Sequence, residues 1–137
     1  MKKIENYLAG KIAPSNSNKF LPVDDPSTGE KIAEVVLSNK EDFNQIVNDS
    51  LKAFENWSQI TPLKRSRIIS KYKEYIEKDI ENLAKLVSIE HGKTLDDAKG
   101  SVTRGLEVVE FACGIPHLLK GEFSQNVGTE IDSWSIR

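Results

Sequence analysis

The sequence predicts an α/β protein that is mostly helical, with short N-terminal strands and a C-terminal hairpin. Turn-forming residues repeatedly interrupt the first 37 residues, which favours short strands. Between Ser38 and about residue 114, apolar residues recur with the spacing of helices, and after Gly121 the pattern becomes extended again. The length of 137 residues is that of a single domain, so we expect one hydrophobic core.

A turn over Asp25 to Gly29 separates two of the predicted N-terminal strands. Pro26 presets the φ angle of a turn, Asp25 can bond the backbone ahead, and Gly29 tolerates positive φ. A strand over residues 31–37 is expected to follow.

Two helices follow these strands. Ser38 and Glu41 have the spacing of a capping box and predict a helix over residues 41–56. Its apolar face comprises Phe43, Ile46, Val47, Leu51 and Phe54. Thr61 followed by Pro62 predicts the start of a second helix, because threonine caps helices and proline suits the first helical position.

Two more helices complete the helical region. The third begins at Ile80 and closes where Gly92 can adopt the left-handed conformation that ends helices. The fourth begins at Thr94, with Asp97 as its capping partner, and its apolar stripe continues to about residue 114. Pro116 is expected to end or kink this helix.

The last residues predict a hairpin. Residues 123–127 and 131–137 are extended segments, and Gly128, Thr129 and Glu130 form the connecting turn. The second strand would run to the last residue without a closing turn, which leaves its edge uncovered. We therefore expect the chain to be a truncated part of a longer protein.

Charge and composition exclude two classes of partner. The 19 basic residues are balanced by 21 acidic ones, which leaves no polybasic surface of the kind that nucleic acid requires. We interpret the local basic group of Lys64, Arg65 and Arg67 as a solvated helix face. No segment approaches the roughly 18 uncharged residues of a membrane helix, and the N-terminus lacks a signal peptide's apolar core. We expect a cytoplasmic protein.

The chain offers few groups for chemistry. Cys113 is the one cysteine, which excludes an internal disulfide, and with only His91 and His117 no metal-ligand cluster is visible. Cys113 lies on an apolar stripe within the predicted fourth helix, with no general base nearby, so we interpret it as a buried, inert thiol. His117 is interpreted as structural, and Trp57 and Trp134 as packing residues.

Four short motifs occur in an order and spacing typical of one family. They are Tyr7 to Gly10, Asp25 to Glu30, Ala53 to Trp57 and Glu90 to Thr94. Together they resemble the N-terminal region of the aldehyde dehydrogenase superfamily. Ala9 and Asp25 depart from the residues usual at their positions, and neither position is catalytic.

A longer stretch, Arg104 to Gly121, resembles the CoA-acylating methylmalonate-semialdehyde dehydrogenase subfamily, and parts of residues 126–137 are similar to the same enzymes. The resemblance implies that residues 1–121 are the N-terminal part of the NAD-binding domain, with strands and then four helices. Residues 122–137 would begin an oligomerisation hairpin, cut short, that pairs with another subunit of a homotetramer. Trp134 would then pack between subunits.

The resemblance also implies an activity. Such enzymes oxidise an aldehyde through cysteine attack and hydride transfer to NAD, and then pass the acyl group to CoA. Methylmalonate or malonate semialdehyde thereby yields propionyl-CoA or acetyl-CoA, CO2 and NADH. The family's nucleophilic cysteine, acid-base glutamate, oxyanion asparagine and glycine-rich NAD turn lie beyond the residues present. We therefore expect no catalytic or cofactor-binding residue in this chain, and no activity from it alone.

Arg104 is the residue expected to meet substrate. Methylmalonate semialdehyde carries a carboxylate, which a guanidinium matches with two parallel hydrogen bonds. The resemblance places Arg104 on a helix that lines the aldehyde tunnel, facing the tunnel, with Gly105 beside it. The alternative is an exposed arginine paired with Glu107 or Glu110, and spacing alone does not decide between the two.

Two other hypotheses stay open. One is a different aldehyde dehydrogenase, such as a succinate-semialdehyde or betaine-aldehyde dehydrogenase, against which Arg104 and the run from Gly114 to Gly121 argue. The other is a complete helical interaction module without catalysis, whose signature would be a stable, soluble monomer.

Overall fold

The computed structural model describes all 137 residues and divides them into two compact units. Unit 1 comprises Met1–Gln59 and Glu81–Lys99, and unit 2 comprises Ile60–Ile80 and Gly100–Arg137. The buried apolar side chains all lie in unit 1, so the division into two units does not add a second core. Chain length sets how much surface can be buried, but it does not determine which elements pack together.

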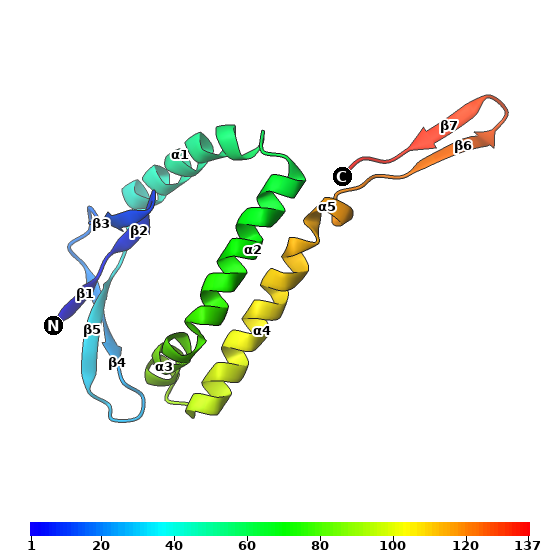
Figure 1. The fold of residues 1–137 in the computed structure, drawn as a ribbon. Helices are drawn as coiled ribbons and strands as arrows, with labels where there is room; N and C mark the ends of the chain where they lie inside the picture. The colour runs from blue at the N-terminus through cyan, green and yellow to red at the C-terminus, as the bar shows by residue number, and fades with distance from the viewer. The chain divides into compact units, whose positions relative to one another are not determined.

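Unit 1 begins with five short strands, as the turn residues predicted (Figure 1). They are β1 (Lys2–Ile4), β2 (Asn6–Leu8), β3 (Lys11–Ala13), β4 (Phe20–Asp24) and β5 (Lys31–Val36). β5 is the central strand of a three-stranded sheet, parallel to β1 and antiparallel to β4, while β2 and β3 form a separate hairpin. Ala9 and Gly10 connect this hairpin with φ angles of 50° and 79°, which match the twist of antiparallel strands.

The predicted turn between β4 and β5 is confirmed. The N–H of Ser27 donates to Asp25 Oδ1 at 2.8 Å, and the N–H of Gly29 donates to the Asp25 carbonyl at 2.7 Å. Gly29 has a φ of +74°, which glycine adopts without strain. β5 ends at Val36, one residue before the predicted end.

Helix α1 (Lys40–Trp57) confirms the first predicted helix but not its cap. The capping box joins Asn39 and Asp42: the N–H of Asp42 donates to Asn39 Oδ1 at 3.0 Å, and the N–H of Asn39 donates to Asp42 Oδ2 at 2.9 Å. Ser38, the predicted cap, donates its hydroxyl to Asn6 Oδ1 at 2.7 Å instead. The cap therefore lies one residue later than the sequence pattern suggested.

Asp42 also ties the loop before β4 to the start of α1. Its carboxylate accepts the Ser15 hydroxyl at 2.5 Å and the Asn16 N–H at 3.0 Å. The side chain is buried, yet the hydrogen bonds, led by that from Ser15, hold the pKa of Asp42 below its ordinary value. A buried carboxylate with this many donors is a fixed structural anion.

Helix α3 (Ile80–His91) ends at the predicted glycine. Gly92 has a φ of +67°, and its N–H donates to the Ser88 carbonyl at 2.8 Å. The Ser88 hydroxyl donates to the Lys93 carbonyl at 2.7 Å, which closes the chain around the helix end. The left-handed cap is confirmed.

Gly92 also meets the turn between β4 and β5. A Cβ on Gly92 would lie 3.0 Å from Pro26 Cγ and 3.2 Å from Ser27 Oγ. Two motifs that the sequence separates by 59 residues, Asp25 to Glu30 and Glu90 to Thr94, therefore touch within unit 1. Glycine satisfies both the positive φ and the lack of space.

Helix α4 (Leu95–Cys113) follows as predicted, and Thr94 Oγ1 caps it by accepting the N–H of Asp97 at 3.3 Å. Its first residues belong to unit 1, where Ala98 is buried and Lys99 forms an ion pair with Glu81. The rest of α4 belongs to unit 2.

Helix α2 (Pro62–Lys78) begins as predicted, with Pro62 in its first turn and Thr61 Oγ1 accepting the N–H of Lys64 at 3.4 Å. Within unit 2, α2 lies beside the greater part of α4 (Figure 1).

Side chains of α2 join it to α4. The Ser66 hydroxyl donates to the Cys113 carbonyl at 2.6 Å, so the end of α4 is capped from α2. Lys73 Nζ lies 3.0 Å from a carboxylate oxygen of Glu77 and 3.4 Å from one of Glu110. Hydrogen bonding to Glu77, with the charge of Glu110, raises the pKa of Lys73.

The end of unit 2 departs from the prediction in two places. α4 ends at Cys113, as expected from Pro116, but a short fifth helix that the sequence did not predict, α5 (Ile115–Leu118), follows with Pro116 in its first turn. β6 (Phe123–Gly128) and β7 (Ile131–Trp134) form the predicted antiparallel hairpin. β7 stops at Trp134 rather than at the last residue. Beyond it the Ser135 N–H still donates to the Glu122 carbonyl at 2.9 Å, but the Glu122 N–H donates to Ser135 Oγ at 3.1 Å and not to a backbone carbonyl.

Few apolar side chains are buried in this chain. Those that are buried are small and lie in unit 1: Ala33, Val36, Ala84 and Ala98. The apolar face predicted for α1 is largely uncovered, with Phe43 64% and Phe54 61% exposed. Trp57 is half-buried, whereas Trp134 is 71% exposed and does not pack within this chain; its packing between subunits stays a prediction. No helix combines the length and the apolar run that crossing a bilayer would require.

Candidate functional site

Arg104 lies near the middle of α4, within unit 2, and its side chain is exposed. Its Nη2 donates to Ser101 Oγ at 3.2 Å. Its Nη1 lies 3.7 Å from the point where a Cβ on Gly100 would stand. Because helical side chains lean toward the helix N-terminus, the guanidinium lies over the turn that precedes its own Cα.

The two carboxylates proposed as partners of Arg104 do not bind it. Glu110 forms its ion pair with Lys73, and no ion pair joins Arg104 to Glu107. A guanidinium has five N–H donors, and Ser101 takes one of them. The remaining donors can meet a planar anion such as a carboxylate.

Sequence reasoning named Arg104 but missed Gly100 and Ser101, which lie four and three residues before it. On a helix these are the positions adjacent to residue 104, and serine carries an oxygen that can accept from arginine. The helical spacing was the available signal. Gly105, the neighbour that the resemblance suggested, has no atom within 4 Å of its Cβ position beyond its own helix backbone and chain neighbours.

Cys113 is the last residue of α4, not a residue in the middle of a helix, and its side chain is half-buried rather than buried. Its sulfur accepts the Ser70 hydroxyl at 3.5 Å and donates to the Val109 carbonyl at 3.4 Å. Neither group is a base that would produce a thiolate. The inertness of the Cys113 thiol stays a prediction, which its hydrogen bonds to Ser70 and Val109 support.

The basic group on α2 is only partly solvated. Lys64 and Arg67 are exposed, but Arg65 is half-buried, and its Nε is buried without a hydrogen-bond partner. The interpretation of Arg65 as solvated is therefore wrong at its Nε, since a long side chain can bury its stem while its end stays in water. His117 is exposed on α5.

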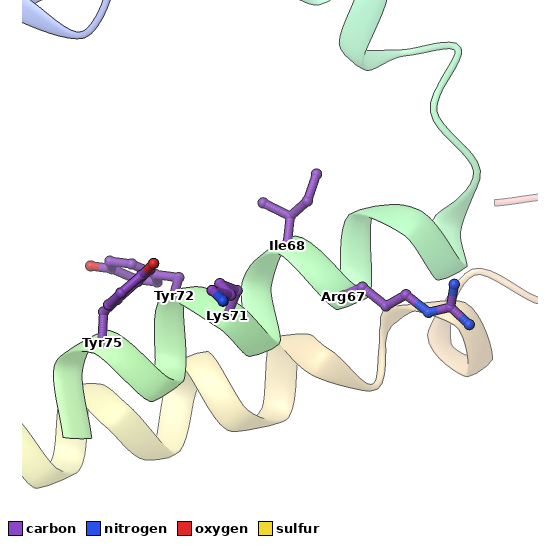
Figure 2. Close-up of a pocket in the computed structure, with 5 residues that line it drawn as sticks. All are labelled: Arg67, Ile68, Lys71, Tyr72 and Tyr75. Carbon is purple, nitrogen blue, oxygen red and sulfur yellow. The ribbon is translucent and has the colours of Figure 1, made fainter. Parts of the chain in front are cut away.

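A shallow depression of about 480 Å³ lies along α2 (Figure 2). Its lining residues are Arg67, Ile68, Lys71, Tyr72 and Tyr75. Ile68 points away from α4 in Figure 2, and Lys71 Nζ lies 5.7 Å from the centroid of the Tyr75 ring. All five side chains come from one helix, so polar groups from different elements do not converge there, as a catalytic site requires.

Comparison with known proteins identifies the family. The model of the Aldehyde dehydrogenase family matches residues 12–135. The chain belongs to the aldehyde dehydrogenase family. The resemblance in the four short motifs is thereby confirmed, as is an α/β fold that matches the N-terminal part of an aldehyde dehydrogenase.

Relatives within the aldehyde dehydrogenase family match almost the whole chain. Malonate-semialdehyde dehydrogenase of Pseudomonas aeruginosa is 38% identical over 135 residues, and malonate-semialdehyde dehydrogenase 2 of Bacillus cereus is 42% identical over 134 residues. In each case 98% of this chain is covered, against 27% and 28% of the relative. The chain therefore spans little more than a quarter of the length of these relatives.

A solved structure gives the same result for the fold. A Sinorhizobium meliloti protein assigned as a methylmalonate-semialdehyde dehydrogenase, and crystallised in complex with NAD, is 38% identical to this chain with a TM-score of 0.94. The match covers 100% of this chain and 28% of that protein.

Proposed function

We propose that the full-length protein containing this chain is an NAD-dependent, CoA-acylating dehydrogenase of methylmalonate and malonate semialdehyde. The observation that carries the proposal is 38% and 42% identity, over 98% of the chain, to two enzymes named for malonate semialdehyde. The Sinorhizobium meliloti protein crystallised with NAD supports the choice of cofactor. The products would be propionyl-CoA or acetyl-CoA, CO2 and NADH.

In this proposal the 137 residues are scaffold, inactive by themselves. NAD supplies the hydride acceptor when it is bound to the full-length protein. None of these residues forms a glycine-rich phosphate loop, and the hydrogen bonds of the Cys113 sulfur join it to Ser70 and Val109 and not to a general base. In this proposal none of these residues holds NAD or CoA.

Arg104 is proposed to bind the carboxylate of the substrate. Its side chain is exposed and free of ion pairs with Glu107 and Glu110, so its fork of N–H donors is available. Lysine would supply a point charge without the fork. The guanidinium would orient the substrate by binding its carboxylate, while oxidation of the aldehyde group takes place elsewhere in the full-length protein.

We further propose that the full-length protein is a cytoplasmic homotetramer in which the β6–β7 hairpin joins a sheet of another subunit. The hairpin supports this because its apolar side chains are uncovered, with Phe123 65% and Trp134 71% exposed. An isolated two-stranded hairpin is marginally stable in water. Sedimentation analysis of the full-length protein would test the assembly.

The activity is tested by NADH formation in the full-length protein, with malonate semialdehyde and propanal as paired substrates and with or without CoA. Arg104→Leu should raise KM for malonate semialdehyde about 10- to 100-fold, since charge-assisted hydrogen bonds contribute about 1.5–3 kcal/mol. Propanal, which has no carboxylate, should be almost unaffected. Arg104→Lys should lie between the two, because it keeps the charge and loses the fork.

Other outcomes would favour other functions. Equal losses on both aldehydes would remove Arg104 from the substrate site. Turnover that prefers succinate semialdehyde and ignores CoA would favour the other aldehyde dehydrogenases. No turnover of any aldehyde would favour an interaction module. NADH formation by the 137 residues alone would contradict the scaffold role.

A further inference from the structure

We propose that Ser101 is a positioning residue that holds the Arg104 guanidinium in the orientation that receives the substrate carboxylate. This inference rests on the proposed function and concerns the same site. Ser101 lies one helical turn before Arg104, and its Oγ accepts from Arg104 Nη2 at 3.2 Å. Of the two side chains, Ser101 is half-buried and Arg104 is exposed.

The difference in burial determines which residue positions the other. Serine has one rotatable side-chain bond and is fixed on the helix surface, whereas arginine has a long flexible stem that samples many rotamers when exposed. A hydrogen bond from Nη2 to Ser101 Oγ selects among those rotamers before substrate arrives. Less side-chain freedom is then lost on binding, which strengthens binding without changing the chemical step.

The hydrogen bond leaves the carboxylate-binding fork usable. Ser101 accepts from one of the two N–H groups of Nη2. The N–H groups of Nε and Nη1 and the second N–H of Nη2 can still donate to a substrate. A carboxylate can still accept two parallel hydrogen bonds from the guanidinium. Ser101 therefore orients the group without occupying it.

Gly100 provides the space that this orientation needs. Its missing Cβ would stand 3.7 Å from Arg104 Nη1, which is ordinary van der Waals contact. Alanine fits at this position, but a branched side chain would fill the volume in which Nη1 lies. The guanidinium is thus bonded at Nη2 and unobstructed at Nη1.

The test compares Ser101→Ala, Ser101→Thr and Arg104→Leu in the full-length protein, with malonate semialdehyde and propanal as substrates. Ser101→Ala should raise KM for malonate semialdehyde about fivefold, as expected for one exposed hydrogen bond, and leave kcat unchanged. Propanal kinetics should not change. Ser101→Thr keeps the hydroxyl and should restore most of the lost affinity. In the Arg104→Leu background, Ser101→Ala should add nothing.

The outcomes separate this inference from the proposed function. If Arg104→Leu selectively weakens malonate semialdehyde while Ser101→Ala behaves as wild type, Ser101 does not position Arg104 and the proposed function stands. Equal effects of Ser101→Ala on both aldehydes would indicate a structural role and also overturn the inference. If Arg104→Leu shows no selectivity, the role of Arg104 fails and the inference fails with it. Gly100→Val, which retains Ser101, should reproduce the selective rise in KM.

Discussion

The contact between Gly92 and Pro26 makes the stability of unit 1 sensitive to a single methyl group. Gly92→Ala imposes two costs. Alanine at a φ of +67° costs about 1 kcal/mol or more relative to glycine. In addition, the new Cβ would lie 3.0 Å from Pro26 Cγ, closer than van der Waals contact allows. The turn that carries Pro26 is held by hydrogen bonds to Asp25, so the ring does not move aside freely.

Gly29 is the matched control. Its φ of +74° imposes the same backbone cost, but a Cβ there would meet nothing within 4 Å. We therefore expect Gly29→Ala to destabilise unit 1 by about 1 kcal/mol and Gly92→Ala by about 2–3 kcal/mol, the excess being overpacking.

Hydrogen exchange in the full-length protein measures this difference locally. Peptides covering the turn at residues 25–30 and the helix end at residues 88–95 should exchange roughly tenfold faster in Gly92→Ala than in Gly29→Ala, since 1.4 kcal/mol is a factor of ten. Pro26→Ala removes Cγ and should recover part of the loss when combined with Gly92→Ala. Equal exchange rates in the two glycine variants would refute the steric argument, because both variants would then lose only the free energy of placing alanine at a positive φ.

Three further substitutions test other contacts. Asp42→Asn should lower the melting temperature at neutral pH, because Ser15 and Asn16 donate to the charged carboxylate. The pKa of Asp42 is lowered in the folded state, so the stabilisation by its charge is complete above the unfolded pKa of 3.8 and is lost as the pH falls below that value. Ser66→Ala should cost about 1 kcal/mol of unfolding free energy by removing the donor to the Cys113 carbonyl. Cys113→Ser in the full-length protein should retain aldehyde oxidation with unchanged kcat.

Each of these has a contradicting result. A melting-temperature difference between wild type and Asp42→Asn that does not shrink as the pH falls from 3.8 through the lowered pKa of the folded state would show that the charge of Asp42 is not what stabilises the loop. Ser70→Ala is the control for Ser66→Ala, because the Ser70 hydroxyl donates to a carbonyl of its own helix and to the Cys113 sulfur but not to the carbonyl at the end of α4. An equal loss in the two variants would contradict the capping argument. Loss of turnover in Cys113→Ser, with normal folding, would make Cys113 catalytic.

Local chemistry made some elements predictable. Thr61 with Pro62 determines a helix start, and Gly92 determines a helix end, because in each case the required backbone conformation is specific to the residue type. The contact of Arg104 with Ser101 is also local, since helical spacing alone brings them together.

Contacts between distant residues were not predictable in this way. Ser38 and Glu41 match a capping box as well as Asn39 and Asp42 do, and the choice between them depends on Asn6 and Ser15, more than twenty residues away. The contact of Gly92 with Pro26 has the same origin. Periodicity marked the apolar face of α1 but could not show whether anything covers it.

The way the chain divides between its units limits how it can be cut. The chain leaves unit 1 after Gln59, returns at Glu81 and leaves again after Lys99. No single cleavage of the backbone separates the two units, and neither can be expressed as one uninterrupted segment. A truncation before residue 81 would remove α3 from unit 1, and one after residue 99 would leave α2 without the greater part of α4. Ribosomal synthesis imposes the same order, since unit 1 is completed only after α2 has emerged.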